Sequence, residues 1–145
     1  MAGRILPGRR PVAERVLALA LALALFPVGV CAHGDWPPRF GGVMNDGGET
    51  SFELLRDSRG IVAHVSDHGE PLEVTGSSPE LQIRRGADRM IVKGRARGTG
   101  IVFSGATLRL GDEVALRMVS ATGSIAFGRF TPAAVARLAS RRPGK

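Results

Sequence analysis

Between Ser51 and Phe130 the chain consists of short apolar segments, separated by turn residues at intervals of about 8–12 positions. In most of these segments apolar and polar residues alternate. Their apolar members are Phe52 and Leu54; Ile61, Ala63 and Val65; Leu72 and Val74; Leu81 and Ile83; Val114, Leu116 and Met118; and Ile125 and Phe127. Such alternation places one face of an antiparallel sheet on the core and the other face in water.

Glycine marks the gaps between the segments, usually beside Asp, Ser or Pro, which are the residues that tight turns favour. No helical periodicity interrupts this pattern. The sequence therefore predicts an all-β fold, a single small antiparallel β-sandwich (Ig-like) or a barrel, of about seven to eight strands. The continuous triplets Met90–Val92 and Ile101–Phe103 are typical of strands that are buried on both faces.

The N-terminal 32 residues have the pattern of a secretory leader. A basic stretch, 1–15, precedes the uncharged stretch 16–32, which is shorter than the about 20 residues that a membrane-spanning helix needs. We therefore expect a signal peptide cut after Ala32, which leaves a periplasmic protein without an integral membrane span. A retained single-helix anchor and a lipoprotein cut before Cys31 are the alternatives.

Removal of this leader would also remove Cys31, the only cysteine, so the exported protein could form no disulfide within itself. The remaining chain divides into three parts. Residues 33–50 are rich in Gly, Pro and Asp and are predicted to be extended, and 51–130 form the sandwich. The tail 131–145 begins with a helix-capping Thr131 and Pro132, and it is predicted to be a short helix or to be disordered.

Most signatures of enzymes are absent from the sequence. There is no Walker loop, no nucleophile elbow and no His-Glu-x-x-His motif, and no thiol would survive cleavage after Ala32. We therefore expect a protein without catalytic activity, although a Ser-His-Asp set assembled from distant positions leaves no signature in a sequence.

The histidines are the candidate metal ligands. Cleavage after Ala32 would make His33 the N-terminal residue, whose free amine and imidazole can chelate one metal ion. Copper suits such nitrogen donors best among the divalent metals, and another transition metal is the alternative. A further ligand would come from His64 or His68, with Met44, Met90 or Met118 as thioether donors. Otherwise His64 is an ordinary strand residue and His68 an ordinary turn residue.

Basic residues outnumber acidic ones by 20 to 13, and a group of them lies between positions 84 and 97. Its members proposed to bind a partner are Arg84, Arg85, Arg89, Arg95 and Arg97. Such a patch suits an acidic partner or an envelope surface. We do not expect nucleic acid as the partner, because the protein is exported and the stretch lacks aromatic residues for base stacking. Alternatively, Arg is simply the default surface cation of this chain.

Several short motifs carry a family resemblance. They are Gly41-Gly42-Val43-Met44, Ser51-Phe52-Glu53-Leu54, Asp67-His68-Gly69-Glu70-Pro71-Leu72 and Arg129-Phe130. In residues 33–130 the chain resembles small β-rich periplasmic proteins found with bacterial heavy-metal (copper, cobalt-zinc-cadmium) efflux systems, and the N-terminal segment of some periplasmic adaptor subunits of those pumps. The chain departs from these proteins at Phe40, where they usually have His.

The resemblance implies an accessory role in heavy-metal handling, by transient metal binding or by docking to efflux-pump components. It also implies that His33 begins the exported protein and that His68 lies in the Asp67-His68-Gly69 turn. The alternative is a structural or adaptor β-sandwich that binds no metal and whose Arg-rich face meets an acidic partner.

Overall fold

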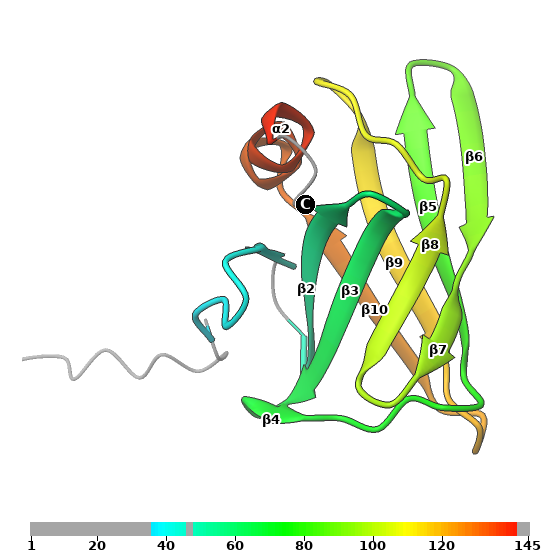
Figure 1. Ribbon diagram of the computed structural model, residues 1–145. Coiled ribbons are helices and arrows are strands. Elements are labelled where there is room, and N and C mark those ends of the chain that lie inside the picture. Colours follow the sequence, from blue (N-terminus) through cyan, green and yellow to red (C-terminus); the bar gives the residue numbers. More distant parts are fainter. Residues whose placement is uncertain (1–35, 46–47, 142–145) are drawn as a thin grey trace, which may run out of the picture. The chain divides into compact units, whose positions relative to one another are not determined.

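The computed structural model describes residues 36–45 and 48–141. Two antiparallel sheets pack face to face (Figure 1). The larger sheet has the order β1 (Val43–Met44), β2 (Thr50–Asp57), β3 (Gly60–Asp67), β8 (Gly100–Ser104) and β7 (Arg95–Arg97), and β4 (Glu70–Pro71) pairs with the end of β3. The smaller sheet has the order β10 (Ile125–Phe130), β9 (Glu113–Val119), β5 (Ser78–Arg85) and β6 (Asp88–Lys93). In the described part of the chain neither sheet closes into a barrel, so the predicted all-β sandwich is confirmed.

The core lies between the two sheets, and the alternating apolar residues fill it. Phe52, Ile61, Leu81, Phe103 and Leu116 are completely shielded from solvent. Because successive side chains of a strand point to opposite faces, each of these positions is followed by one that faces outward. The predicted alternation is thus correct for β2, β3, β5 and β9.

Three expectations differ from the structure. The triplet Met90–Val92 lies on an edge strand and is partly exposed, with 51% of Ile91 accessible, because β6 has a neighbour on one side only. In β10 the face that carries Ile125 and Phe127 is the exposed one, and Phe130 points into the core. Leu72 and Val74 form no strand, although Val74 is buried.

The chain passes from the smaller to the larger sheet at Gly94. Its N–H donates to the carbonyl of Pro79 at 2.9 Å, which ends the pairing with β5, and β7 begins at the next residue. A Cβ at Gly94 would lie 2.6 Å from Cε1 of Phe103 and 2.7 Å from Cγ2 of Ile101. Only glycine lets the backbone approach the core this closely.

The tail forms helix α2 (Pro132–Ser140), as Thr131 and Pro132 predict. The Thr131 hydroxyl accepts a hydrogen bond from the N–H of Ala134 at 3.2 Å, which satisfies one free donor of the first turn. The helix buries Val135 and Leu138 against the sandwich, so packing stabilises a helix too short to persist alone. No helix in the described ranges is long and apolar enough to cross a bilayer.

The predicted signal peptide, the N-terminal His33 and the last residues of the tail lie outside the described residues.

Candidate functional site

A row of side chains crosses the outer face of the larger sheet. Strand register places Met44 beside Glu53, Glu53 beside His64, His64 beside Gly100, and Gly100 beside Arg97. Directly opposed residues of neighbouring strands share a face and have Cβ atoms about 4.5–5.5 Å apart. The row therefore brings a thioether, a carboxylate and an imidazole together on one surface.

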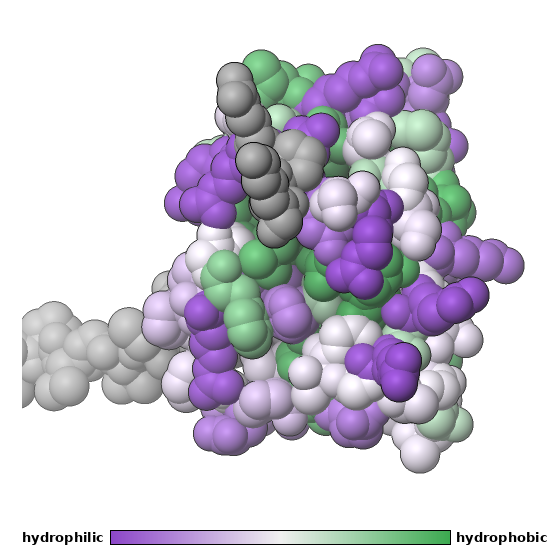
Figure 2. Space-filling view, viewed as in Figure 1, coloured by the Kyte–Doolittle hydropathy of each residue, from purple (hydrophilic) through white to green (hydrophobic). Residues whose placement is uncertain are grey.

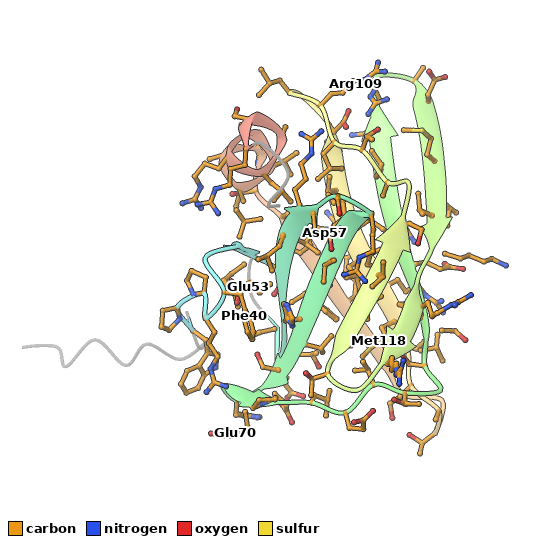
Figure 3. All side chains as sticks on the ribbon, in the orientation of Figure 1. Phe40, Glu53, Asp57, Glu70, Arg109 and Met118 are labelled. Atoms are coloured by element: carbon orange, nitrogen blue, oxygen red, sulfur yellow. The ribbon has the colours of Figure 1, made fainter. Side chains whose placement is uncertain are left out.

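The carboxylate of this row is buried, because the segment that precedes β1 folds back over it. Glu53 is only 4% exposed. Its Oε1 accepts hydrogen bonds from the N–H groups of Phe40 (2.9 Å) and Gly42 (2.6 Å), and its Oε2 accepts one from Arg39 (2.7 Å). Gly41 has a φ of 74°, which curves this backbone around the carboxylate. Glu53 thus holds the N-terminal segment on the sheet (Figure 3).

The same segment places an aromatic ring on the histidine of the row. Phe40 stacks on His64, with ring centroids 3.9 Å apart and an angle of 24° between the ring planes. Phe40 itself is 57% exposed. Figure 2 shows hydrophobic surface at the N-terminal segment, bordered by hydrophilic residues.

The second histidine lies in the tight turn between β3 and β4. His68 has a φ of 45° and Gly69 a φ of 80°, the pair of positive values that a type I′ hairpin turn requires. Nδ1 of His68 lies 2.7 Å from Oδ1 of Asp67. The indole of Trp36 lies against Gly69, so closely that a Cβ there would be 2.8 Å from its Cε3 atom.

These parts surround one open pocket of about 370 Å³. The residues around it that matter for chemistry are Trp36, Phe40, Met44, Glu53, His64, His68 and Glu70. Both described histidines therefore reach the same pocket. Of the three candidate thioethers only Met44 joins them, since Met118 is buried in the core and Met90 lies on β6 of the other sheet.

The donor set fits a soft metal ion incompletely. Across residues 36–45 and 48–141 no three His, Cys, Asp or Glu side chains are grouped so that they could hold a metal ion. Both oxygens of Glu53 already accept hydrogen bonds from the backbone. The donors that remain at the pocket are the imidazoles of His64 and His68, the Met44 thioether and the exposed Glu70 carboxylate.

The predicted arginine patch is divided between the two sheets. Arg84 and Arg89 are opposed on β5 and β6, whereas Arg95 and Arg97 belong to β7 of the larger sheet. Arg84 donates to Glu113 through Nε at 3.0 Å. Arg89 donates to Oε1 of Gln82 at 3.2 Å.

Arg85 has a structural partner. Its Nε and Nη2 each donate to the Asp112 carboxylate at 2.8 Å, and the N–H of Arg109 donates to the same carboxylate at 2.8 Å. Asp112 is 2% exposed. Its hydrogen bond from Arg85 lowers the pKa of the Asp112 carboxyl, against the opposing effect of burial.

The sequence pointed to His64 and His68 but not to Trp36, Phe40 or Glu53 as parts of the site. The buried role of Glu53 has no local signal, because its alternation with Phe52 and Leu54 is typical of a solvated position. No family model, no curated protein and no solved structure matches the chain.

Proposed function

We propose that this chain is an exported, periplasmic accessory protein of heavy-metal handling, which binds copper transiently at the pocket between Trp36, His64 and His68. The observation that carries the proposal is the gathering of His64, His68 and Met44 around one open pocket on the outer face of the larger sheet. Imidazole and thioether donors favour copper over harder ions. An open pocket with few protein donors suits an ion that is taken up and passed on.

The N-terminus supplies the missing donors in this proposal. His33 precedes Trp36 by three positions, and a chain spans at most about 3.3–3.6 Å per residue. Three residues span at most about 11 Å, so an N-terminal His33 would be within reach of the pocket that Trp36 borders. Cleavage after Ala32 would add an amine and an imidazole to the donors of His64, His68 and Met44. The receiving partner that we propose is a component of a heavy-metal efflux pump, on the basis of the resemblance in residues 33–130.

The proposed role is binding rather than catalysis. Glu53 is the buried carboxylate of the site, and backbone N–H groups occupy both of its oxygens. It is therefore poorly suited to take up a proton from a substrate.

Copper titration of the protein that begins at His33 tests the proposal. Cu(I) under a reductant and Cu(II) are titrated against a chromophoric competitor, and the fluorescence of Trp36, the single tryptophan, reports on the pocket. We expect saturable binding with a dissociation constant below about 100 μM. Absence of such binding for both oxidation states would refute the proposal.

Matched variants locate the site. Met44→Leu is expected to weaken Cu(I) binding at least about fivefold, equivalent to ~1 kcal/mol, whereas Met90→Leu on the other sheet leaves it unchanged. His64→Gln tests the imidazole, and an additional Met before His33 tests the free amine. If Met90→Leu and Met44→Leu have equal effects, copper binds elsewhere on the protein.

A further inference from the structure

Apart from the pocket on the larger sheet, the surface has a second notable feature, which is the edge of the smaller sheet formed by β6. Among the described residues β6 pairs with β5 alone, and in Figure 1 it forms the right-hand border of the sandwich. Its exposed apolar residues include Ile91 (51%) and Met90 (37%). Figure 2 shows hydrophobic surface together with long hydrophilic side chains along this border.

The pairing pattern identifies the backbone groups that are free along this edge. Antiparallel pairs alternate between hydrogen-bonded and non-hydrogen-bonded positions. The bond from the Gly94 N–H to Pro79 fixes the phase, so Val92 and Met90 occupy hydrogen-bonded positions opposite β5. The N–H and C=O groups of the intervening residues point away from β5. These residues are Arg89, Ile91 and Lys93.

The side chains of these residues also share one face. Arg89, Ile91 and Lys93 lie opposite Arg84, Gln82 and Glu80 on the outer surface of the smaller sheet. The edge therefore presents a cation, an apolar side chain and a second cation at alternate positions, each beside a free backbone donor and acceptor. Within the described part of the chain, the side chain of Arg89 donates only to the neutral amide of Gln82, at 3.2 Å.

This order of charges selects the occupant of the edge. If two copies of β6 paired, Arg89 and Lys93 of one copy would oppose Ile91 or a cation of the other, and directly opposed like charges are destabilising. Cationic residues on an edge strand protect it from such self-association. A strand with acidic, apolar and acidic residues at alternate positions would satisfy the charges and the backbone together.

We propose that the edge of β6 binds an extended acidic segment of a partner protein, which adds to the smaller sheet as a further strand beside Arg89, Ile91 and Lys93. Main-chain hydrogen bonds would provide affinity in this mode, and the alternate side chains would provide selectivity. The β6 edge belongs to the smaller sheet and the proposed copper pocket to the larger one, so failure of either proposal would leave the other unaffected.

Synthetic peptides test the proposal on the complete exported chain. The probe is N-acetyl Thr-Glu-Thr-Val-Thr-Glu-Thr amide, with two controls: one with Lys for both Glu residues, and one with Pro for the central Val. Binding is followed by calorimetry and by backbone amide shifts of Arg89, Ile91 and Lys93. We expect both controls to bind at least about tenfold more weakly than the probe. Equal binding of the Pro peptide would overturn the proposal, because that peptide keeps the charge and loses the strand.

Variants of the protein provide the complementary test. Ile91→Pro removes an N–H that faces away from β5, and proline is tolerated at such edge positions. We expect a fall of at least about tenfold in affinity for the probe, with circular dichroism unchanged. The double variant Arg89→Glu/Lys93→Glu keeps the strand and is expected to prefer the Lys peptide. An unchanged peptide preference in that double variant would refute strand addition. If Ile91→Pro and the parent bind the probe equally well, and also bind anionic lipid vesicles equally well, the surface attracts acidic groups by charge alone and strand addition is likewise refuted.

Discussion

The ring of Phe40 covers the ring of His64, with centroids 3.9 Å apart and planes 24° apart. Phe40 belongs to the segment that Glu53 holds on the sheet, so a hydrogen-bond network of the backbone determines how accessible the imidazole is. The resemblance that we inferred from the sequence leads us to expect His rather than Phe at this position. The stacked pair is therefore the place where one substitution most directly changes the donor set of the pocket.

Phe40→His is expected to tighten copper binding at least about tenfold, because it adds an imidazole beside His64. Copper titration against a chromophoric competitor measures the change. Phe40→Leu is the matched control, since it uncovers His64 without adding a donor. Similar affinities of Phe40→His and Phe40→Leu would show that the added imidazole contributes nothing.

Glu53→Gln is expected to release the N-terminal segment. The substitution replaces a charged acceptor of the N–H groups of Arg39, Phe40 and Gly42 by a neutral amide. We expect a loss of about 1–3 kcal/mol in the free energy of unfolding. Faster hydrogen exchange at residues 39–42 would report the release. Glu49→Gln, at an exposed position, should change neither quantity.

Gly69→Ala is expected to displace Trp36 from the pocket. The new Cβ would meet the indole at 2.8 Å, and the φ of 80° is strained for alanine. Gly98→Ala has a comparable φ of 58° but meets nothing within 4 Å. Both variants should lose about 1 kcal/mol of stability, and only Gly69→Ala should change the emission of Trp36. The same emission change in Gly98→Ala would place its cause in the backbone rather than in the indole contact.

The ion pair of Asp112 with Arg85 is expected to make the folded protein less stable in acid. The pKa of Asp112 in the folded protein is lowered, chiefly by the hydrogen bond from Arg85, so its contribution is complete above the pKa of the unfolded chain, about 4. The contribution disappears as the pH falls through the lower, folded pKa. Urea unfolding should therefore show a smaller difference between pH 7 and pH 3 for Asp112→Asn than for the parent. Glu49→Gln, at an exposed position away from this ion pair, is expected to keep the parental difference.

The architecture was predictable where one face of a strand is clearly apolar. Phe52 and Leu54, or Leu81 and Ile83, alternate with polar residues, and burial on one face explains both the pattern and the structure. The helix was predictable from Thr131 and Pro132 because capping is a local effect. In β10 both faces carry apolar residues, so the pattern could not show that Phe130 rather than Phe127 points inward.

The site was less predictable, because its geometry depends on contacts between distant segments. His64 and His68 were identifiable by residue type alone. The approach of residues 39–42 to Glu53 joins segments more than ten positions apart, and the alternation around Glu53 is typical of a solvated side chain. In the same way, only the structure shows that Arg85 is paired with the buried Asp112, whereas Arg89 lies on an edge strand.

The order in which the chain visits the two sheets has a consequence for how the protein unfolds. Strands β1 to β4 belong to one sheet, β5 and β6 to the other, β7 and β8 to the first again, and β9 and β10 to the second. Among the described residues, no continuous fragment contains one sheet whole without also containing strands of the other. We therefore expect that neither sheet remains folded on its own. A proteolytic cut in any connection between the sheets should abolish the cooperative unfolding transition rather than release a stable fragment.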